Sequence, residues 1–190
     1  MNKRQESAIR KSGIFTLAQG KELGLSQQDI SRLVASKDLK RVGRGIYLHP
    51  DAQLDRDVGF QIAFAKFGPE AAIGGLSALY HYNLAEQVPG QVWVLVPPEK
   101  RTRARGYKLI RTKTGLDKQI VDEKSYRIVS VERAVLEGLK FITKIGEKTA
   151  VKAARESLAR GLTTEMKLAK AAKELGLESV LAKYLEVIAP

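Results

Sequence analysis

In the first fifty residues, apolar positions recur at the spacing of short helices and are interrupted by polar caps and glycine. Residues 16–19 (Thr-Leu-Ala-Gln) and 26–29 (Ser-Gln-Gln-Asp) have the capping-box pattern, in which a hydroxyl accepts a hydrogen bond from the third helical amide. Gly24, which lies between them, is typical of a helix end. The pattern predicts two helices separated by a tight turn, after a more polar helix over residues 3–11.

The helix that begins after Ser26 has two different faces. Ile30, Leu33 and Val34 fall at i, i+3 and i+4 and form an apolar stripe. The opposite face carries small or polar side chains, namely Gln28, Ser31, Arg32 and Ala35, and Gln27 is expected to be exposed at the start of the helix. Gln pairs with adenine edges and Arg with guanine edges in the DNA major groove, so this face is a candidate base-reading surface. A solvated polar face is the alternative interpretation.

A β-hairpin is predicted directly after this helix. Residues 39–48 contain two short strand-like runs joined by a Gly-Arg-Gly tip, and glycine supplies turn conformations that other residues resist. A hairpin in this position is the wing of a winged helix-turn-helix. Arg44 at its tip and Arg41 on its first strand would then contact the DNA backbone. The pattern thus predicts a DNA-binding domain over residues 1–50.

Beyond this hairpin the pattern predicts a second, larger domain over residues 54–190. Polar residues after Pro50 mark a short hinge, and Val58, Ile62 and Ala65 then keep helical spacing. A small sheet is predicted from strand-like runs at residues 92–96, 107–110 and 126–129. Cap and glycine signals predict a closing helical bundle over residues 130–140, 147–160, 163–176 and 178–188. The predicted fold class is therefore α+β, mainly helical.

Charge is distributed unevenly along the chain, whose net charge is +12. Residues 1–50 hold ten basic and four acidic residues, residues 51–98 two and five, and residues 99–113 seven and one. Two basic regions therefore flank an acidic one, which favours a polyanionic partner. A possible second basic surface consists of Lys100, Arg101, Arg103 and Arg105. On an extended strand the alternating arginines would point to one side, whereas a solvated loop or a toxin-facing or RNA-facing surface would have the same pattern.

Several kinds of chemistry are disfavoured by the residues that the chain lacks. It has no cysteine and two histidines, which excludes a disulfide framework, thiolate zinc sites and thiol catalysis. The predicted strands at 92–96 and 107–110 carry none of the carboxylates that a metal-dependent nuclease needs, and a lone His81 is typical of a packing residue. We therefore expect no metal, no cofactor and no enzymatic activity.

The hydropathy of the chain bears on its location. No window approaches the roughly 18 consecutive apolar residues of a membrane span. The first six residues are followed by no apolar signal-peptide core. We therefore expect a cytoplasmic protein that makes no contact with a membrane.

Short motifs in both halves of the chain resemble AbiEi-type antitoxins, which are transcriptional regulators of type IV toxin-antitoxin systems. Those similar to the N-terminal domain of this family are residues 13–16 (Gly-Ile-Phe-Thr), 21–26 (Lys-Glu-Leu-Gly-Leu-Ser) and 42–47 (Val-Gly-Arg-Gly-Ile-Tyr). Those similar to its second domain are residues 74–84, 92–97 and 128–135. The chain differs from the family pattern at Asn83, where a glycine is usual, and in its Lys- and Ala-rich tail.

The resemblance implies a fold and a role. It implies a winged helix that binds the promoter of its own operon, and so a repressor that autoregulates a toxin-antitoxin operon. It also implies a C-terminal domain that acts as the antitoxin against a nucleotidyltransferase-like toxin encoded alongside, without a stable complex. Many single winged helices bind inverted repeats in double-stranded DNA as paired copies. The alternative is an interaction module whose basic C-terminal domain binds a protein or RNA target, with the winged helix as its support.

Overall fold

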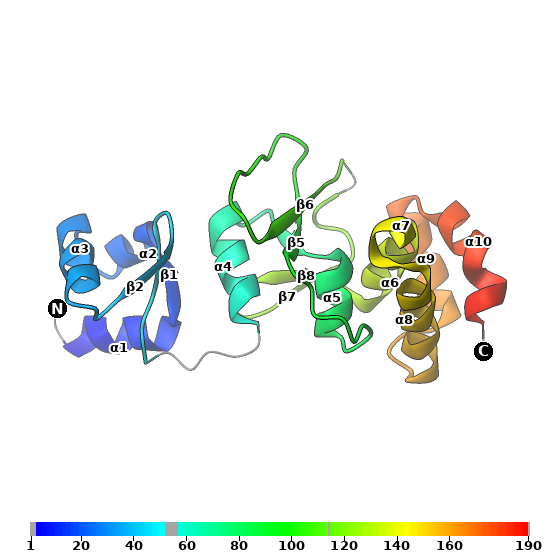
Figure 1. Ribbon diagram of the computed structural model, residues 1–190, viewed down its shortest axis with the longest axis horizontal. Helices are drawn as coiled ribbons and strands as arrows, with labels where there is room; N and C mark the ends of the chain where they lie inside the picture. Colours follow the sequence, from blue (N-terminus) through cyan, green and yellow to red (C-terminus); the bar gives the residue numbers. More distant parts are fainter. Residues whose placement is uncertain (1–2, 52–56, 114, 190) are drawn as a thin grey trace. The chain divides into compact units, whose positions relative to one another are not determined.

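The chain folds as two compact units, Met1–Gly68 and Pro69–Pro190. The computed structural model describes residues 3–51, 57–113 and 115–189 (Figure 1). The predicted hinge, with the start of the second domain at Leu54, lies outside the described residues.

The N-terminal unit combines short helices with a three-stranded antiparallel sheet of order β1-β3-β2. Its elements are α1 (Lys3–Ser12), β1 (Ile14–Thr16), α2 (Leu17–Glu22), α3 (Gln27–Ala35), β2 (Lys40–Gly43), β3 (Ile46–Leu48) and α4 (Val58–Phe67). Both predicted capping boxes are present, at the starts of α2 and α3. The predicted helices and hairpin are confirmed, and β1 adds a strand that the sequence pattern did not reveal.

The core of this unit is small and lies between the helices and the sheet. It consists of the buried residues Ile9, Phe15, Leu25, Ile30, Leu39 and Tyr47. Leu33 and Val34 are partly buried and pack against it, so the apolar stripe predicted for α3 faces inward. Burial of these side chains stabilises the unit and leaves the opposite face of α3 free of packing constraints.

Helix α4 belongs to the N-terminal unit, although the sequence analysis assigned it to the second domain. The division of the chain lies after Gly68, whereas we expected it between residues 50 and 54. The physical reason is packing, because α4 lies against β1, β2 and β3. Its buried residues are Phe60, Ala63 and Phe67, so the predicted stripe of Val58, Ile62 and Ala65 is only half-buried.

The C-terminal unit contains a mixed five-stranded sheet of order β6-β5-β4-β8-β7. Its strands are β4 (Ala72–Ile73), β5 (Val92–Val96), β6 (Tyr107–Arg111), β7 (Ile120–Asp122) and β8 (Arg127–Val129). The pairs β5–β6 and β4–β8 are parallel, and the pairs β4–β5 and β7–β8 are antiparallel. The three predicted strands are confirmed. They join one sheet only because the two-residue strand β4, which is too short for a periodic signal, lies between β5 and β8.

The helices of the C-terminal unit surround α6 (Figure 1). They are α5 (Gly75–His81), α6 (Val131–Lys140), α7 (Ile142–Ile145), α8 (Glu147–Ala159), α9 (Glu165–Leu175) and α10 (Glu178–Ile188). Every residue of α6 from Arg133 to Leu139 is buried. Helices α5, α8, α9 and α10 all lie against α6. The predicted helices are confirmed, except that Thr164 rather than Thr163 caps α9, while the buried Thr163 donates a hydrogen bond to Glu132.

The small-residue motif at residues 74–84 has a structural explanation. A Cβ atom on Gly74 would lie 2.0 Å from Leu95 Cδ1, and one on Gly75 would lie 2.4 Å from Trp93 Cε3. The fully buried Ser77 accepts a hydrogen bond from the Trp93 N–H at 2.9 Å. The motif therefore lets α5 approach β5 closely and satisfies a backbone donor of that strand.

A buried ion pair within α6 is also hydrogen-bonded to other segments of this unit. The Arg133 Nε–H donates to Glu137 Oε1 at 2.9 Å, and both side chains are less than a tenth exposed. Arg133 Nη1 also donates to the carbonyls of Gly115 and Lys118, while Glu137 Oε2 accepts from the Gly75 N–H at 3.3 Å. Each charged group thus has partners in a place where an unpaired charge would be costly.

Candidate nucleic-acid interface

The outer face of α3 presents the polar side chains that the sequence singled out. Gln27, Gln28, Ser31 and Arg32 are all exposed. Together with Ser26 they line one surface hollow of about 820 Å³. The structure therefore brings these predicted site residues together on a single helix face.

The start of α3 is held by reciprocal hydrogen bonds. Ser26 Oγ accepts from the Asp29 N–H at 3.1 Å, and Asp29 Oδ2 accepts from the Ser26 N–H at 2.9 Å. Hydrogen bonds from the Ser26 side chain and backbone hold the pKa of the Asp29 carboxyl below its ordinary value. A lowered folded-state pKa means that this stabilisation is complete at neutral pH and is lost as the pH falls from the ordinary value through the lowered one.

Ser26→Ala is expected to destabilise the N-terminal unit by about 1 kcal/mol, because the third helical amide of α3 loses its side-chain acceptor. Ser31→Ala is the matched control, since Ser31 is exposed on the same helix and does not cap it. Amide hydrogen exchange of α3 would measure the change in stability in both variants. Equal protection of α3 in the two variants would contradict the capping role.

The hairpin β2–β3 presents Arg44 at its tip, where the side chain is exposed. Gly45 has a φ of +69°, and its carbonyl accepts a hydrogen bond from the Leu17 N–H at 2.9 Å. This bond ties the tip to the first residue of α2. Gly43 does not have a positive φ, so only one of the two tip glycines supplies the expected turn conformation.

Arg41 lies on β2 of the same hairpin and is exposed. Its Nε–H donates to the Gly43 carbonyl at 3.3 Å, so the guanidinium is held along the hairpin. The structure therefore places both predicted backbone-contacting arginines, Arg41 and Arg44, on the hairpin.

The second basic surface does not have the geometry that we expected. Residues 101–104 have no regular secondary structure, and β6 begins only at Tyr107. The arginines of this segment therefore do not alternate on a strand. Arg101 Nη1 donates to the Pro98 and Lys100 carbonyls, so Arg101 folds back on its own loop. Arg103 and Arg105 are exposed.

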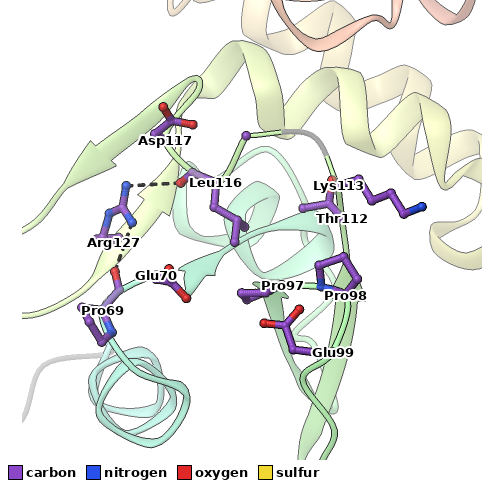
Figure 2. Close-up of a pocket in the computed structure, with 11 residues that line it drawn as sticks. Pro69, Glu70, Pro97, Pro98, Glu99, Thr112, Lys113, Leu116, Asp117 and Arg127 are labelled. Atoms are coloured by element: carbon purple, nitrogen blue, oxygen red, sulfur yellow. Dashed lines mark hydrogen bonds between the residues drawn. The ribbon is translucent and has the colours of Figure 1, made fainter.

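A cavity of about 690 Å³ lies at one end of the second sheet (Figure 2). Glu70, Glu99 and Asp117 contribute carboxylates to its lining. Arg127, also in the lining, donates to the Pro69 and Leu116 carbonyls, as Figure 2 shows, and to Asp122. Within the part of the chain that the structure describes, no group of three or more His, Asp or Glu residues is placed to hold a metal ion.

Comparison with known proteins supports the class of protein that the N-terminal unit suggests. Residues 5–50, which include α3 and the β2–β3 hairpin, match the family described as "Transcriptional regulator, AbiEi antitoxin". This match confirms the resemblance of the N-terminal motifs, which lie within residues 5–50. No curated protein matches the chain.

A solved structure shares the fold over nearly the whole chain. The crystal structure of the RV2827C protein from Mycobacterium tuberculosis matches with a TM-score of 0.60 at 13% sequence identity. The match covers 98% of this chain and 80% of that chain. At this level of identity the likeness concerns the fold alone. Among the described residues, no helix is long and apolar enough to span a membrane.

Proposed function

We propose that the N-terminal unit is a winged helix-turn-helix that binds double-stranded DNA. Helix α3 would enter the major groove with Gln28, Ser31 and Arg32 towards the base edges and Gln27 at its start, and Arg41 and Arg44 would hold the hairpin on the sugar-phosphate backbone. The observation that carries this proposal is the exposed polar face of α3 above a packed apolar face. The excess of positive charge in residues 1–50, ten basic against four acidic, supports it.

The regulatory role follows from the matched family, which is one of transcriptional regulators and antitoxins. We propose that the chain represses the promoter of its own toxin-antitoxin operon, with paired copies on inverted repeats, and that it works in the cytoplasm. The C-terminal unit would act as the type IV antitoxin against a nucleotidyltransferase-like toxin. No catalytic step is part of this proposal.

Fluorescence anisotropy tests the DNA-binding function directly. Labelled duplex from the upstream region of the gene, and separately a labelled scrambled duplex, is titrated with the full chain at a series of salt concentrations. Binding that prefers the upstream duplex and survives moderate salt is the expected result. Weak binding that is equal for both duplexes and abolished by salt would contradict the regulator.

Arg32→Ala and Arg44→Ala are expected to weaken DNA binding in different ways. Arg44→Ala should lower affinity for any duplex and reduce the salt slope by about one, because a phosphate contact is lost. Arg32→Ala should cost about 1–3 kcal/mol on the upstream duplex and erode sequence preference. Lys173→Ala, an exposed lysine of α9, is the control for charge. Equal losses on specific and scrambled DNA would contradict base reading by Arg32.

A second function is favoured by the exposed Arg103 and Arg105 in the loop before β6. In this alternative the C-terminal unit binds a protein or RNA target and the N-terminal unit supports it. Purification of the full chain separates the two functions. A protein or RNA that co-purifies with the chain, with no retention of DNA, would favour the second function, whereas retention of DNA alone would contradict it.

A further inference from the structure

Three lysines surround two aromatic rings in the C-terminal unit. Lys108 Nζ lies 3.8 Å from the centre of the Trp93 ring, and Lys140 Nζ and Lys144 Nζ lie 5.7 Å and 5.5 Å from the centre of the Phe141 ring. The ring centroids of Trp93 and Phe141 are 6.5 Å apart. We call these five residues the lysine–aromatic cluster.

The fold assembles this cluster from segments that are distant in the sequence. Lys108 lies directly opposite Trp93 in the parallel β5–β6 register, and β6 is an edge strand of the sheet. Lys140 ends α6, Phe141 joins α6 to α7, and Lys144 lies in α7. Lys140 and Lys144 are exposed, Phe141 is half-buried, and Trp93 is 5% exposed. Trp93 is therefore the buried member of the cluster, while Phe141 is partly accessible at the surface.

The three lysines of the cluster form no close ion pair with a carboxylate among the described residues. Lys152 shows the opposite situation, because Glu86 at 2.6 Å raises the pKa of that lysine. Burial, and secondly the charge of Lys144, instead lower the pKa of Lys108. Such a cluster gains from an anionic partner.

Helix capping accounts for only part of this arrangement. Lysines near the C-terminal ends of helices interact favourably with the free carbonyls there, which suits Lys140 and Lys144. Lys108 lies on a strand and has no such role. Its placement over Trp93, beside Lys144 and next to a half-buried aromatic ring, needs a different explanation.

We propose that the lysine–aromatic cluster binds single-stranded nucleic acid. The lysines would contact successive phosphates, and Phe141 would stack on an unpaired base. A duplex hides the faces of its bases, so it would use the lysines but not the ring. This site is separate from the outer face of α3 and does not depend on the duplex binding proposed above.

The test uses the full chain and labelled 12-nucleotide oligouridylate and oligothymidylate, which cannot form duplexes with themselves. Trp93 is the single tryptophan of the chain, so its emission reports on the cluster alone. We expect saturable binding by anisotropy with a parallel change in Trp93 emission. The relative affinities for the two oligonucleotides distinguish RNA from DNA as the natural source.

Two variants and a matched control locate the site. Lys108→Gln with Lys144→Gln should weaken binding by about tenfold or more through lost phosphate contacts. Phe141→Leu should weaken binding by about tenfold while keeping the salt slope, because stacking is lost and charge is not. Lys170→Gln with Lys173→Gln removes the same charge from the exposed face of α9 and should change affinity little.

Several results would overturn the proposal. One is an equal loss in the α9 control, which would make the attraction a general effect of charge. Another is equally tight binding of a 12-base-pair duplex with the same change in Trp93 emission. A third is binding that leaves Trp93 emission unchanged. The cluster variants should still bind the upstream duplex through the N-terminal unit, so this site and the proposed regulator can fail independently.

Discussion

Arg133→Met is expected to lower the free energy of unfolding of the C-terminal unit by about 3–5 kcal/mol, because it leaves Glu137 charged and buried without its partner. Arg133 is 2% exposed, and its Nη1 also holds the Gly115 and Lys118 carbonyls at 3.1 Å and 2.6 Å. The variant therefore loses an ion pair and two backbone anchors at once. Urea unfolding followed by Trp93 emission would measure the loss within this unit.

Two further variants show whether the cost arises from an unpaired buried charge. Arg160→Met disrupts a partly exposed pair with Glu156, also at i,i+4, and should cost less than about 1 kcal/mol. Adding Glu137→Gln to Arg133→Met should recover part of the lost stability, since the uncompensated charge disappears while an acceptor for the Gly75 N–H remains. An Arg133→Met protein within about 1 kcal/mol of the parent would contradict this account.

Gly75→Ala is expected to destabilise the same unit by about 2–4 kcal/mol. Its φ of +51° adds about 1 kcal/mol of strain for any residue with a Cβ. The new Cβ would also lie 2.4 Å from Trp93 Cε3, and overpacking of this kind costs about 1–3 kcal/mol. The rigid Trp93 ring lies in the core and cannot move aside without disturbing β5.

Gly176→Ala separates strain from overpacking. Gly176 has a φ of +65°, but no atom lies within 4 Å of a Cβ added there. It should therefore cost only about 1 kcal/mol. Thermal unfolding of both variants would give the difference. Equal losses at the two positions would mean that contact with Trp93 does not explain the need for glycine at residue 75.

The small residues before and within α5 have a structural role. Gly74, Gly75 and Ser77 are buried and serve the contact between α5 and β5. These three residues therefore serve packing and do not form a binding surface. We expect residues that bind a partner to lie among exposed groups, such as Arg103, Arg105 and the exposed lysines of the lysine–aromatic cluster, Lys140 and Lys144.

The candidate site of the N-terminal unit could be predicted from the sequence because its signals are local. Capping at Ser26 and Asp29 determines where α3 begins, and the i, i+3, i+4 stripe of Ile30, Leu33 and Val34 determines which face is buried. The remaining face must then be exposed. The hairpin tip at Arg44 is equally local, since Gly45 reverses the chain within a few residues.

Features that depend on contacts between distant segments were decided by the tertiary structure alone. Strand β4 has two residues and no periodic signal, yet it lies at the centre of the second sheet because β5 and β8 both pair with it. Helix α4 joined the N-terminal unit because β1, β2 and β3 offer it a surface. Lys108 meets Trp93 only through the β5–β6 register. Hydrophobic periodicity specifies which face of an element is buried, but the partner that covers it depends on how the whole chain packs.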